Sequence, residues 1–324
     1  MNSVLVLALN PSIDAEWRVE DVLWEEKNNV LSENRWAGGK GINVARWLNH
    51  LRCKTKLILP LGGLTGDELA GHLRVEKLSA QIIPLRQPTR VNVIVTTKRR
   101  RQMRFNPLGP ELSADEWGKI QKRIENHLEQ SLEGMATHSV RAALSQTDDG
   151  AHGVTRPTAL LILTGSLPRG VAVSTYQKLI RVAHRHGVKT LLDCDGTAFM
   201  AAVKARPFLV KPNEHELAQW SGKPLRTERE ILQAARKLSA TIRGWVLVSR
   251  GGKRCWLVNV GEEVEIHVTP PRVKPRNTVG AGDALLAAVA NQIMLGKSPT
   301  DWLRCGIETG TAATQLQAGK LPAR

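Results

Sequence analysis

Short apolar runs alternate with longer amphipathic segments along most of the chain. The apolar runs, which are four to six residues long, cover residues 4–9, 56–61, 158–163, 188–193, 208–211 and 245–249. The amphipathic segments cover residues 42–51, 68–78, 113–133, 175–186, 196–204, 214–221, 228–239 and 284–294. Runs of this length are typical of buried strands, and strands that alternate with helices predict a doubly wound, mainly parallel sheet with helices on both faces.

Two other regions have a different pattern. Residues 15–36 alternate apolar and polar positions, and residues 89–95 and 103–106 flank a basic tip. These patterns predict exposed strands that pair as a small separate sheet. Residues 256–260 and 264–268 predict a hairpin, and residues 134–156, which lack periodicity, predict a surface insertion.

The charge narrows the possible partners. The formal net charge is +16, and the densest basic run lies at residues 98–104. We interpret this run as a solvated hairpin tip and predict no nucleic-acid partner, because neither zinc-finger spacing nor an aromatic-studded strand accompanies it.

The four cysteines form no CxxC pair, which favours a reducing, cytoplasmic setting. The first apolar run is too short for a membrane span, so no membrane partner is expected.

The segment 277–284 carries the strongest chemical signal. Gly280, Ala281 and Gly282 precede an Ala- and Leu-rich helix, whose unpaired N–H groups would form an anion site suited to a phosphoryl group. A carboxylate at Asp283 would repel a phosphate, but it could take the proton from a hydroxyl that attacks one. The alternative is an ordinary acidic residue in the first turn of a helix.

A second glycine-rich segment lies at residues 37–41. It would let a ligand approach the backbone, with Lys40 supplying a cation and Asn43 an amide from the helix that follows. It is not a GxGxxG motif, so a dinucleotide site is not predicted. Asp14 follows the first strand, where it could either cap a turn or hold a sugar hydroxyl.

Six motifs then occur in a recognisable order, at residues 10–14, 37–43, 89–90, 165–168, 211–217 and 278–283. From residue 4 to about residue 315 the chain resembles the ribokinase-like sugar kinases, and within them the phosphofructokinase-B branch. The resemblance implies a Rossmann-like α/β domain (residues 1–10, 37–85 and 108–324) and a β-sheet lid over the sugar site (residues 11–36 and 86–107).

The resemblance also implies ATP and Mg²⁺ as cofactors and a role for each matching residue. Asp283 would be the general base, with Gly280, Ala281 and Gly282 as the backbone anion site. The sugar phosphate would be bound by Asp14, Lys27, Gly39, Lys40, Asn43, Arg90 and Ser166. Asn213, Ser249 and Gly251 would contact the nucleotide, and Glu216 would bind Mg²⁺ and its waters.

Two departures from the family pattern bear on the nucleotide. The family turn usually has Ser-Leu-Gly-x-x-Gly-Ala, whereas residues 249–255 have Arg250 for leucine and Arg254 for the third glycine. A positive φ at Arg254 would cost about 1 kcal/mol, and its side chain could crowd the nucleotide or pair with a phosphate. The chain also ends soon after Thr314, so we expect the customary last helix to be missing. Both departures motivate an alternative class, a catalytically weakened sugar-phosphate-binding protein.

The substrate expected from these motifs is a phosphorylated ketohexose. Residues 37–40, which end at Lys40, resemble the 1-phosphofructokinase and tagatose-6-phosphate kinase branches. Residues 89–93 and 105–106 favour 1-phosphofructokinase. We predict phosphorylation of fructose 1-phosphate to fructose 1,6-bisphosphate, with tagatose-6-phosphate kinase and 6-phosphofructokinase as alternatives. A homodimer formed through the lid is a further expectation from the resemblance.

Overall fold

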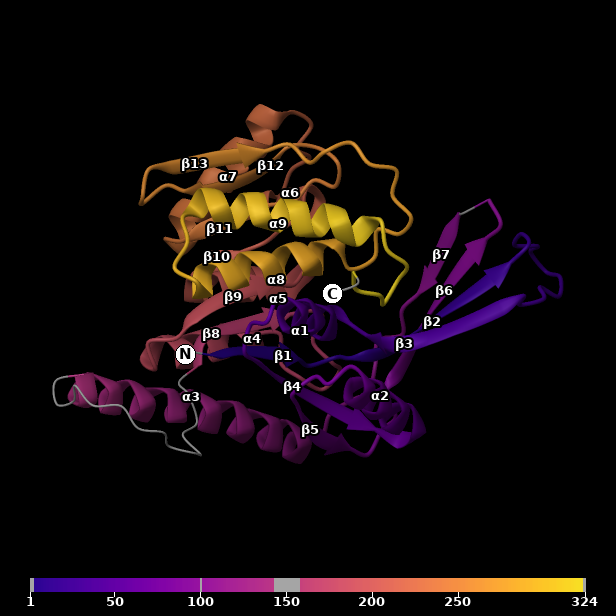
Figure 1. Cartoon of the computed structure of the whole chain (residues 1–324), viewed down its shortest axis with the longest axis horizontal. Coiled ribbons are helices and arrows are strands. Elements are labelled where there is room, and N and C mark those ends of the chain that lie inside the picture. The colour runs from indigo at the N-terminus through magenta and orange to yellow at the C-terminus, as the bar shows by residue number, and fades with distance from the viewer. Residues whose placement is uncertain (1–2, 100, 143–157, 323–324) are drawn as a thin grey trace.

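A nine-stranded sheet forms the centre of the molecule (Figure 1). The structure is a computed structural model, and it describes residues 3–99, 101–142 and 158–322. The strand order is β13-β12-β11-β10-β9-β8-β1-β4-β5, and all neighbours are parallel except the pairs that involve β12. The strands are β1 (Ser3–Ala8), β4 (Thr55–Gly62), β5 (Ala80–Leu85), β8 (Thr158–Thr164), β9 (Lys189–Asp193), β10 (Leu209–Val210), β11 (Trp245–Val248), β12 (Cys255–Asn259) and β13 (Val264–Val268).

Helices cover both faces of this sheet. They are α1 (Lys40–His50), α2 (Gly63–Val75), α3 (Ala114–Ala142), α4 (Thr175–Arg185), α5 (Gly196–Ala202), α6 (Glu214–Ser221), α7 (Glu228–Ile242), α8 (Ala281–Met294) and α9 (Pro299–Thr314), with a 3₁₀ turn, η1 (Val203–Ala205). Alternate residues of each strand point to opposite faces, so the sheet separates two cores. Leu5 and Leu7 pack with α3 to α7, whereas Val4 and Val6 pack with α1, α2, α8 and α9. The predicted doubly wound fold is confirmed.

A second sheet of four strands projects from one end of the molecule (Figure 1). It has the order β3-β2-β6-β7 and consists of β2 (Ser12–Val19), β3 (Ser32–Gly38), β6 (Arg90–Thr97) and β7 (Gln102–Phe105). In the register of β2 and β6, Ser12 lies opposite Arg90 and Asp14 lies opposite Asn92. The predicted small sheet is therefore present, and its base adjoins the end of β1. Its role as a lid, and the predicted domain boundaries, stay predictions.

The main differences from the expected elements lie at glycine-rich and mixed-polarity segments. The helix expected at residues 68–78 instead begins at Gly63, which has the left-handed φ of +64°, and ends at Val75. The helix expected to end at residue 133 continues to Ala142, so the prediction of an irregular insertion is wrong for residues 134–142. Residues 143–156 of that predicted insertion lie outside the described residues. Within the described part of the chain, no helix is long and apolar enough to cross a membrane.

Candidate active site

A polar cavity of about 710 Å³ lies where the carboxyl ends of the central strands meet the base of the small sheet. This is the edge at which parallel α/β sheets bind ligands. Most of the predicted site residues line it: Asp14, Gly39, Lys40, Asn43, Arg90, Ser166, Asn213, Glu216, Ser249, Gly280, Gly282 and Asp283. Ala281 and Gly251 line a second cavity beside it. Lys27 lines neither cavity and lies in the exposed connection between β2 and β3.

The start of α8 forms one wall of the polar cavity. Gly280 is the N-cap residue and has φ +79°, a left-handed conformation that glycine adopts without strain. Just before it, the side chain of Asn277 accepts a hydrogen bond of 3.1 Å from the amide of Val279, which fixes the approach to the helix. Asp283 lies in the first helical turn and is buried. The helix thus presents unpaired N–H groups and a carboxylate to the same space.

The environment of Asp283 suits a general base. Burial, together with the nearby carboxylate of Asp193, raises the pKa of Asp283 to about 6. Lys40, Lys211 and a hydrogen bond of 2.8 Å from the side-chain amide of Asn43 oppose this rise. A carboxylate with such a pKa is ionised at neutral pH, yet it is a stronger proton acceptor than an exposed aspartate.

Two lysines share one buried carboxylate behind this base. The Nζ atom of Lys40 lies 3.0 Å from Oδ1 of Asp193, and the Nζ atom of Lys211 lies 3.0 Å from Oδ2. Burial alone would raise the pKa of the Asp193 carboxyl and lower the pKa of the Lys40 ammonium, but their pairing reverses both shifts. The two ammonium groups and the Asp193 carboxylate together carry a net charge of +1, and the carboxylates of Asp283 and Glu216 lie close enough to act on Lys40 as well.

Asp14, in β2, lies where the small sheet lines the polar cavity. Its Oδ1 atom accepts hydrogen bonds from Ser12 Oγ at 2.7 Å and from Asn92 Nδ2 at 2.9 Å. Burial raises the pKa of Asp14, and these two donors oppose the rise. The carboxylate is therefore held in one orientation by neighbours on two strands of the small sheet. Held acceptors of this kind bind hydroxyl groups.

Arg90, the first residue of β6, is hydrogen-bonded to the segments that follow β1 and β7. Its Nη1 atom donates to the carbonyl of Pro107 at 2.8 Å, and its Nη2 atom donates to the carbonyl of Asn10 at 2.9 Å. Its Nε atom is buried, and none of the residues that the structure describes accepts a hydrogen bond from it. The side-chain amide of Asn10 donates to Ser166 Oγ at 3.1 Å, so Asn10 links two predicted substrate contacts.

Sequence reasoning missed several residues that line the polar cavity. These are Asn10, Asn92, Arg104, Asn106, Asp193 and Lys211. Asp193 and Lys211 had a signal, since each is a charged residue at the carboxyl end of an apolar run. Arg104 was treated as part of a solvated tip, but the pairing of β6 with β7 brings it beside Ile94 and into the cavity wall.

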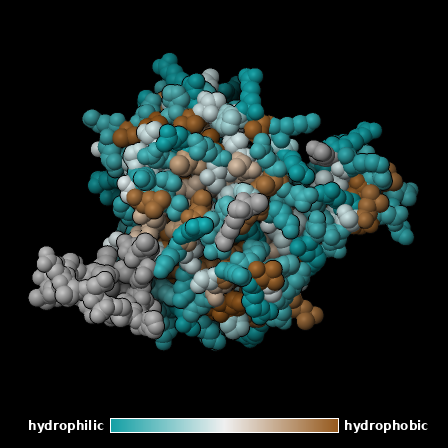
Figure 2. All heavy atoms as spheres, viewed as in Figure 1, coloured by the Kyte–Doolittle hydropathy of each residue, from teal (hydrophilic) through white to brown (hydrophobic). Residues whose placement is uncertain are grey.

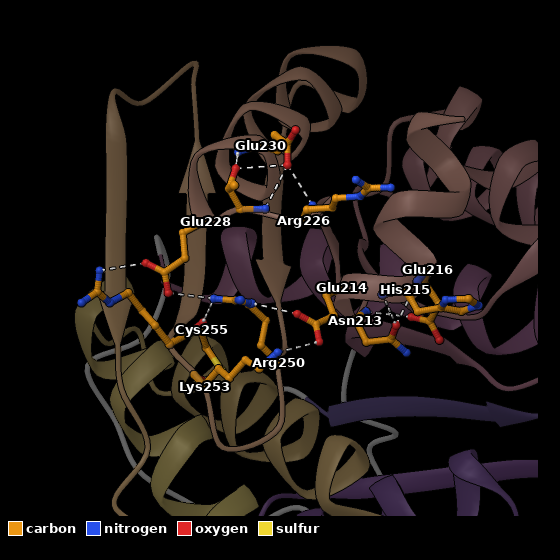
Figure 3. Close-up of polar contacts among 12 residues, drawn as sticks. Asn213, Glu214, His215, Glu216, Arg226, Glu228, Glu230, Arg250, Lys253 and Cys255 are labelled. Carbon is orange, nitrogen blue, oxygen red and sulfur yellow. Dashed lines mark hydrogen bonds and ion pairs between the residues drawn. The ribbon is translucent and has the colours of Figure 1, made fainter. Parts of the chain in front are cut away.

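The start of α6 also lines the polar cavity, and Figure 3 shows the side chains of Asn213 and Glu216 at this start. Asn213 caps the helix through a reciprocal capping box: its Oδ1 atom accepts from the amide of Glu216, whose Oε2 atom accepts from the amide of Asn213 at 2.8 Å. Burial raises the pKa of Glu216. Among the described residues, no group of three or more acidic, histidine or cysteine side chains could hold a metal ion. Glu216 fits the looser mode of Mg²⁺, which retains waters and shares substrate phosphates.

The second cavity has a volume of about 450 Å³ and opens beside the first. Both cavities are lined by Ser249, Thr278 and Gly282, so the start of α8 borders both. Much of the second cavity is apolar, with Pro270, Pro271, Val273, Pro275, Leu285 and Ile307 in its wall. An apolar slot next to an anion site matches the base and phosphates of a nucleotide.

Arg254 does not behave as expected from the motif. It is absent from the described residues with positive φ, so no left-handed strain arises there. Its Nη1 atom lies 3.1 Å from Oε2 of Glu228, so the expected pairing with a phosphate has no support here, and Arg254 lines neither cavity. Arg254 therefore crowds neither cavity.

A buried carboxylate at a helix start, between a polar cavity and an apolar slot, is the arrangement expected of a phosphotransferase with an alcohol group as acceptor. Comparison with known proteins supports this class. The model of the pfkB family carbohydrate kinases matches residues 3–153 and 153–323. The chain belongs to the pfkB family of carbohydrate kinases.

Individual relatives extend over almost the whole chain. The chain is 30% identical to the ATP-dependent 6-phosphofructokinase isozyme 2 of Escherichia coli (strain K12), over 99% of this chain and 95% of that protein. It is 27% identical to the 1-phosphofructokinase of Bacillus subtilis (strain 168), over 95% of this chain and 91% of that protein. The crystal structure of phosphofructokinase-2 from Escherichia coli in complex with fructose-6-phosphate has a TM-score of 0.82 and 28% identity, covering 97% of this chain and 94% of that one.

Proposed function

We propose that this protein is an ATP-dependent kinase of phosphorylated ketohexoses and that its preferred acceptor is fructose 1-phosphate, which it converts to fructose 1,6-bisphosphate. The observation that carries the proposal is the position of Asp283. This buried carboxylate lies in a cavity that also contains Asp14, Asn43 and Arg90, and its helix borders the apolar slot. A sugar hydroxyl and a nucleotide phosphate could therefore meet at the start of α8.

The proposed transfer needs positioning and charge neutralisation. Asp283 accepts the proton of the attacking sugar hydroxyl while the hydroxyl oxygen bonds to the γ-phosphorus of ATP. The bond between that phosphorus and the β–γ bridging oxygen breaks, and ADP leaves. The N–H groups around Gly280 to Gly282 bind the transferred group, and the ammonium groups of Lys40 and Lys211 offset its charge. Glu216 would hold Mg²⁺ through its waters, and the ion would supply further neutralisation of the phosphates.

The far end of the cavity would receive the phosphate that the sugar already carries. Arg90 and Arg104, two cations on strands of the small sheet, line the cavity and support this, and the side chain of Asn106 adds an amide. Arginine is well suited to this task because its planar donors match phosphate oxygens. The small sheet, residues 11–36 and 86–107, supplies Asp14 and all three of these residues. We propose that it acts as the lid of the site.

Fructose 6-phosphate is the second candidate acceptor, since the Escherichia coli relative is a 6-phosphofructokinase. Lys40 favours fructose 1-phosphate, because the minor 6-phosphofructokinase type tends to have glycine at this position. Tagatose 6-phosphate remains the third candidate, on the weaker resemblance of residues 193–196. The alternative class, a catalytically weakened sugar-phosphate-binding protein, is disfavoured for two reasons. Gly280 and Gly282 are present before Asp283, and Arg254 pairs with Glu228 instead of entering a cavity.

The test is a panel of sugar phosphates assayed for ADP release with MgATP. We expect turnover with fructose 1-phosphate at a higher kcat/KM than with fructose 6-phosphate or tagatose 6-phosphate, and fructose 1,6-bisphosphate as the product. A higher value with fructose 6-phosphate would overturn the proposed substrate. Absence of ADP release with every sugar phosphate would overturn the kinase function.

We also propose that two copies pair through the projecting sheet. The face of the molecule seen in Figure 2 is largely hydrophilic, but an apolar group of atoms is visible on that arm. The connection between β2 and β3 exposes Leu23, Trp24, Val30 and Leu31, and Trp24 is 77% exposed. Lys27 belongs to the same connection, so its predicted contact with a substrate phosphate would have to be made in a neighbouring subunit. Light scattering should give a dimer that Trp24→Glu converts to a monomer; a monomeric wild-type protein would overturn the pairing.

A further inference from the structure

Two arginines of the loop between β11 and β12 bind two glutamates at the starts of α6 and α7 (Figure 3). Arg250 donates from Nε to Glu214 Oε2 at 3.1 Å and from Nη1 to Glu228 Oε1 at 2.9 Å. Arg254 donates from Nη1 to Glu228 Oε2 at 3.1 Å. We call Arg250, Arg254, Glu214 and Glu228 the arginine clasp.

Arg250 is the centre of the clasp. Its side chain is only 7% exposed, whereas those of Glu214 and Glu228 are 40% and 46% exposed. A buried guanidinium must be hydrogen-bonded, because leaving its donors unpaired is costly. Nη1 also lies 3.4 Å from the carbonyl of Arg254, across the turn. The conformation of the loop is therefore tied to the two glutamates and to its own backbone.

The clasp connects the β11–β12 loop, which borders the apolar cavity, with the start of α6, which lines the polar cavity. The amide of Ser249 donates to the carbonyl of Pro212 at 3.1 Å, so the loop is already joined to the chain just before α6. Ser249 lines both cavities, and Gly251 lines the apolar one. Glu214 is the first residue of α6 and lies two residues before Glu216. Arg250 thus bonds directly to the helical turn that carries Glu216.

The composition of the loop gives a second argument. Arg250 and Arg254 occupy the two positions at which the family pattern of this turn usually has leucine and glycine. Both arginines turn away from the cavities toward Glu214 and Glu228, and the arginine side chains line neither cavity. The two arginines that depart from the family pattern are therefore both ion-paired with glutamates.

We propose that Arg250 is a positioning residue for the nucleotide: through Glu214 and Glu228 it holds the β11–β12 loop and the first turn of α6 as one unit. The inference rests on the proposed use of ATP. It assigns Arg250 no contact with the substrate and no part in the proton transfer. Its loss should therefore weaken nucleotide binding and leave the chemistry at Asp283 largely intact.

Kinetics of Arg250→Leu, Glu214→Gln and the double variant test the proposal. We expect the KM for ATP to rise about five- to twentyfold in Arg250→Leu, with kcat and the KM for the sugar phosphate within about twofold of wild type. Glu214→Gln should give a smaller rise, and the double variant should be no worse than Arg250→Leu. A matched control is Arg236→Leu, which breaks the Arg236–Glu265 pair (2.7 Å) away from the loop. Equal changes in both KM values, or the same effect in the control, would overturn the proposal.

Amide hydrogen exchange of the protein without ligands gives a readout that does not need activity. Exchange in residues 249–255 should be at least about tenfold faster in Arg250→Leu and Glu214→Gln than in wild type or Arg236→Leu. Glu214→Gln is isosteric, so it keeps the test valid if Arg250→Leu fails to fold. Unchanged exchange would overturn the clasp. Faster exchange in a protein that shows no ATP turnover would instead overturn the proposed function and leave the clasp standing.

Discussion

The side-chain amide of Asn43 donates a hydrogen bond of 2.8 Å to Oδ2 of Asp283. Among the described protein groups, none donates to Oδ1, so Oδ1 is available to accept the proton of a substrate hydroxyl. The orientation of the Asn43 amide is itself fixed. Arg46 donates from Nη1 to Asn43 Oδ1 at 2.9 Å, and its Nε and Nη2 atoms bind the carboxylate of Glu76 at 2.6 and 2.9 Å.

This relationship predicts that Arg46→Met lowers turnover although Arg46 lies behind the substrate contacts. Without the guanidinium, the Asn43 amide can rotate and Asp283 loses its fixed orientation. We expect kcat to fall about ten- to hundredfold, with the KM for ATP nearly unchanged. Arg35→Met, which breaks the pair of Arg35 with Glu68 at 2.7 Å, is the matched control. A folded Arg46→Met variant with normal kcat would contradict the role of this contact.

The pH dependence of the reaction follows from the raised pKa of Asp283. The base acts only when it is deprotonated, so activity should be present above pH 6 and fall as the pH drops through about 6. We expect kcat/KM for the sugar phosphate to follow a single apparent pKa near 6 on the acid side. A rate that stays constant from pH 8 down to pH 5 would show that another group accepts the proton.

The same pKa has a consequence for stability. Because the pKa of Asp283 is higher in the folded chain than in the unfolded one, the ionised carboxylate destabilises the fold above pH 6. Asp283→Asn should therefore increase the free energy of unfolding at pH 8 by on the order of 1–3 kcal/mol. The gain should shrink as the pH falls through 6 and vanish near pH 4. Thermal unfolding at both pH values measures it, and equal gains at both would argue against this cause.

Arg104→Ala and Arg90→Ala should weaken binding of the sugar phosphate. Each removes a cation of the small sheet that lines the polar cavity. We therefore expect the KM for the sugar phosphate to rise about ten- to hundredfold with a small change in kcat. Arg104 gives the cleaner test, because Arg90 also bonds to the carbonyls of Pro107 and Asn10. Lys98→Ala, at the exposed tip, is the control. An unchanged KM in both arginine variants would place the phosphate elsewhere.

Much of the fold could be predicted because hydrophobic periodicity records the two faces of the sheet. Val4 and Leu5 point to different cores, and the apolar runs of the buried strands reflect that. The edge strand β5 was missed, since only Ile83 among its residues is buried. The end of α3 was missed because residues 134–142 carry no clear periodicity.

Those parts of the site that consist of residues close together in the sequence were predictable. Gly280 to Asp283 and Asn213 to Glu216 are local motifs at helix starts, and the structure has both as expected. Pairings between distant residues were not predictable. Lys40 and Asp193 are 153 residues apart, and Arg254 meets Glu228 only because β12 and α7 adjoin. A single sequence contains no signal for such contacts.

The most direct test of the account is phosphoryl transfer by Asp283→Asn with fructose 1-phosphate and MgATP at pH 8. Removal of the general base should lower turnover about 10²–10⁴-fold, while both substrates still bind with affinities close to those of wild type. Calorimetry of binding together with single-turnover rates separates the two effects. A variant that binds both substrates and transfers the phosphoryl group at a near-normal rate would contradict the assignment of Asp283 as the base.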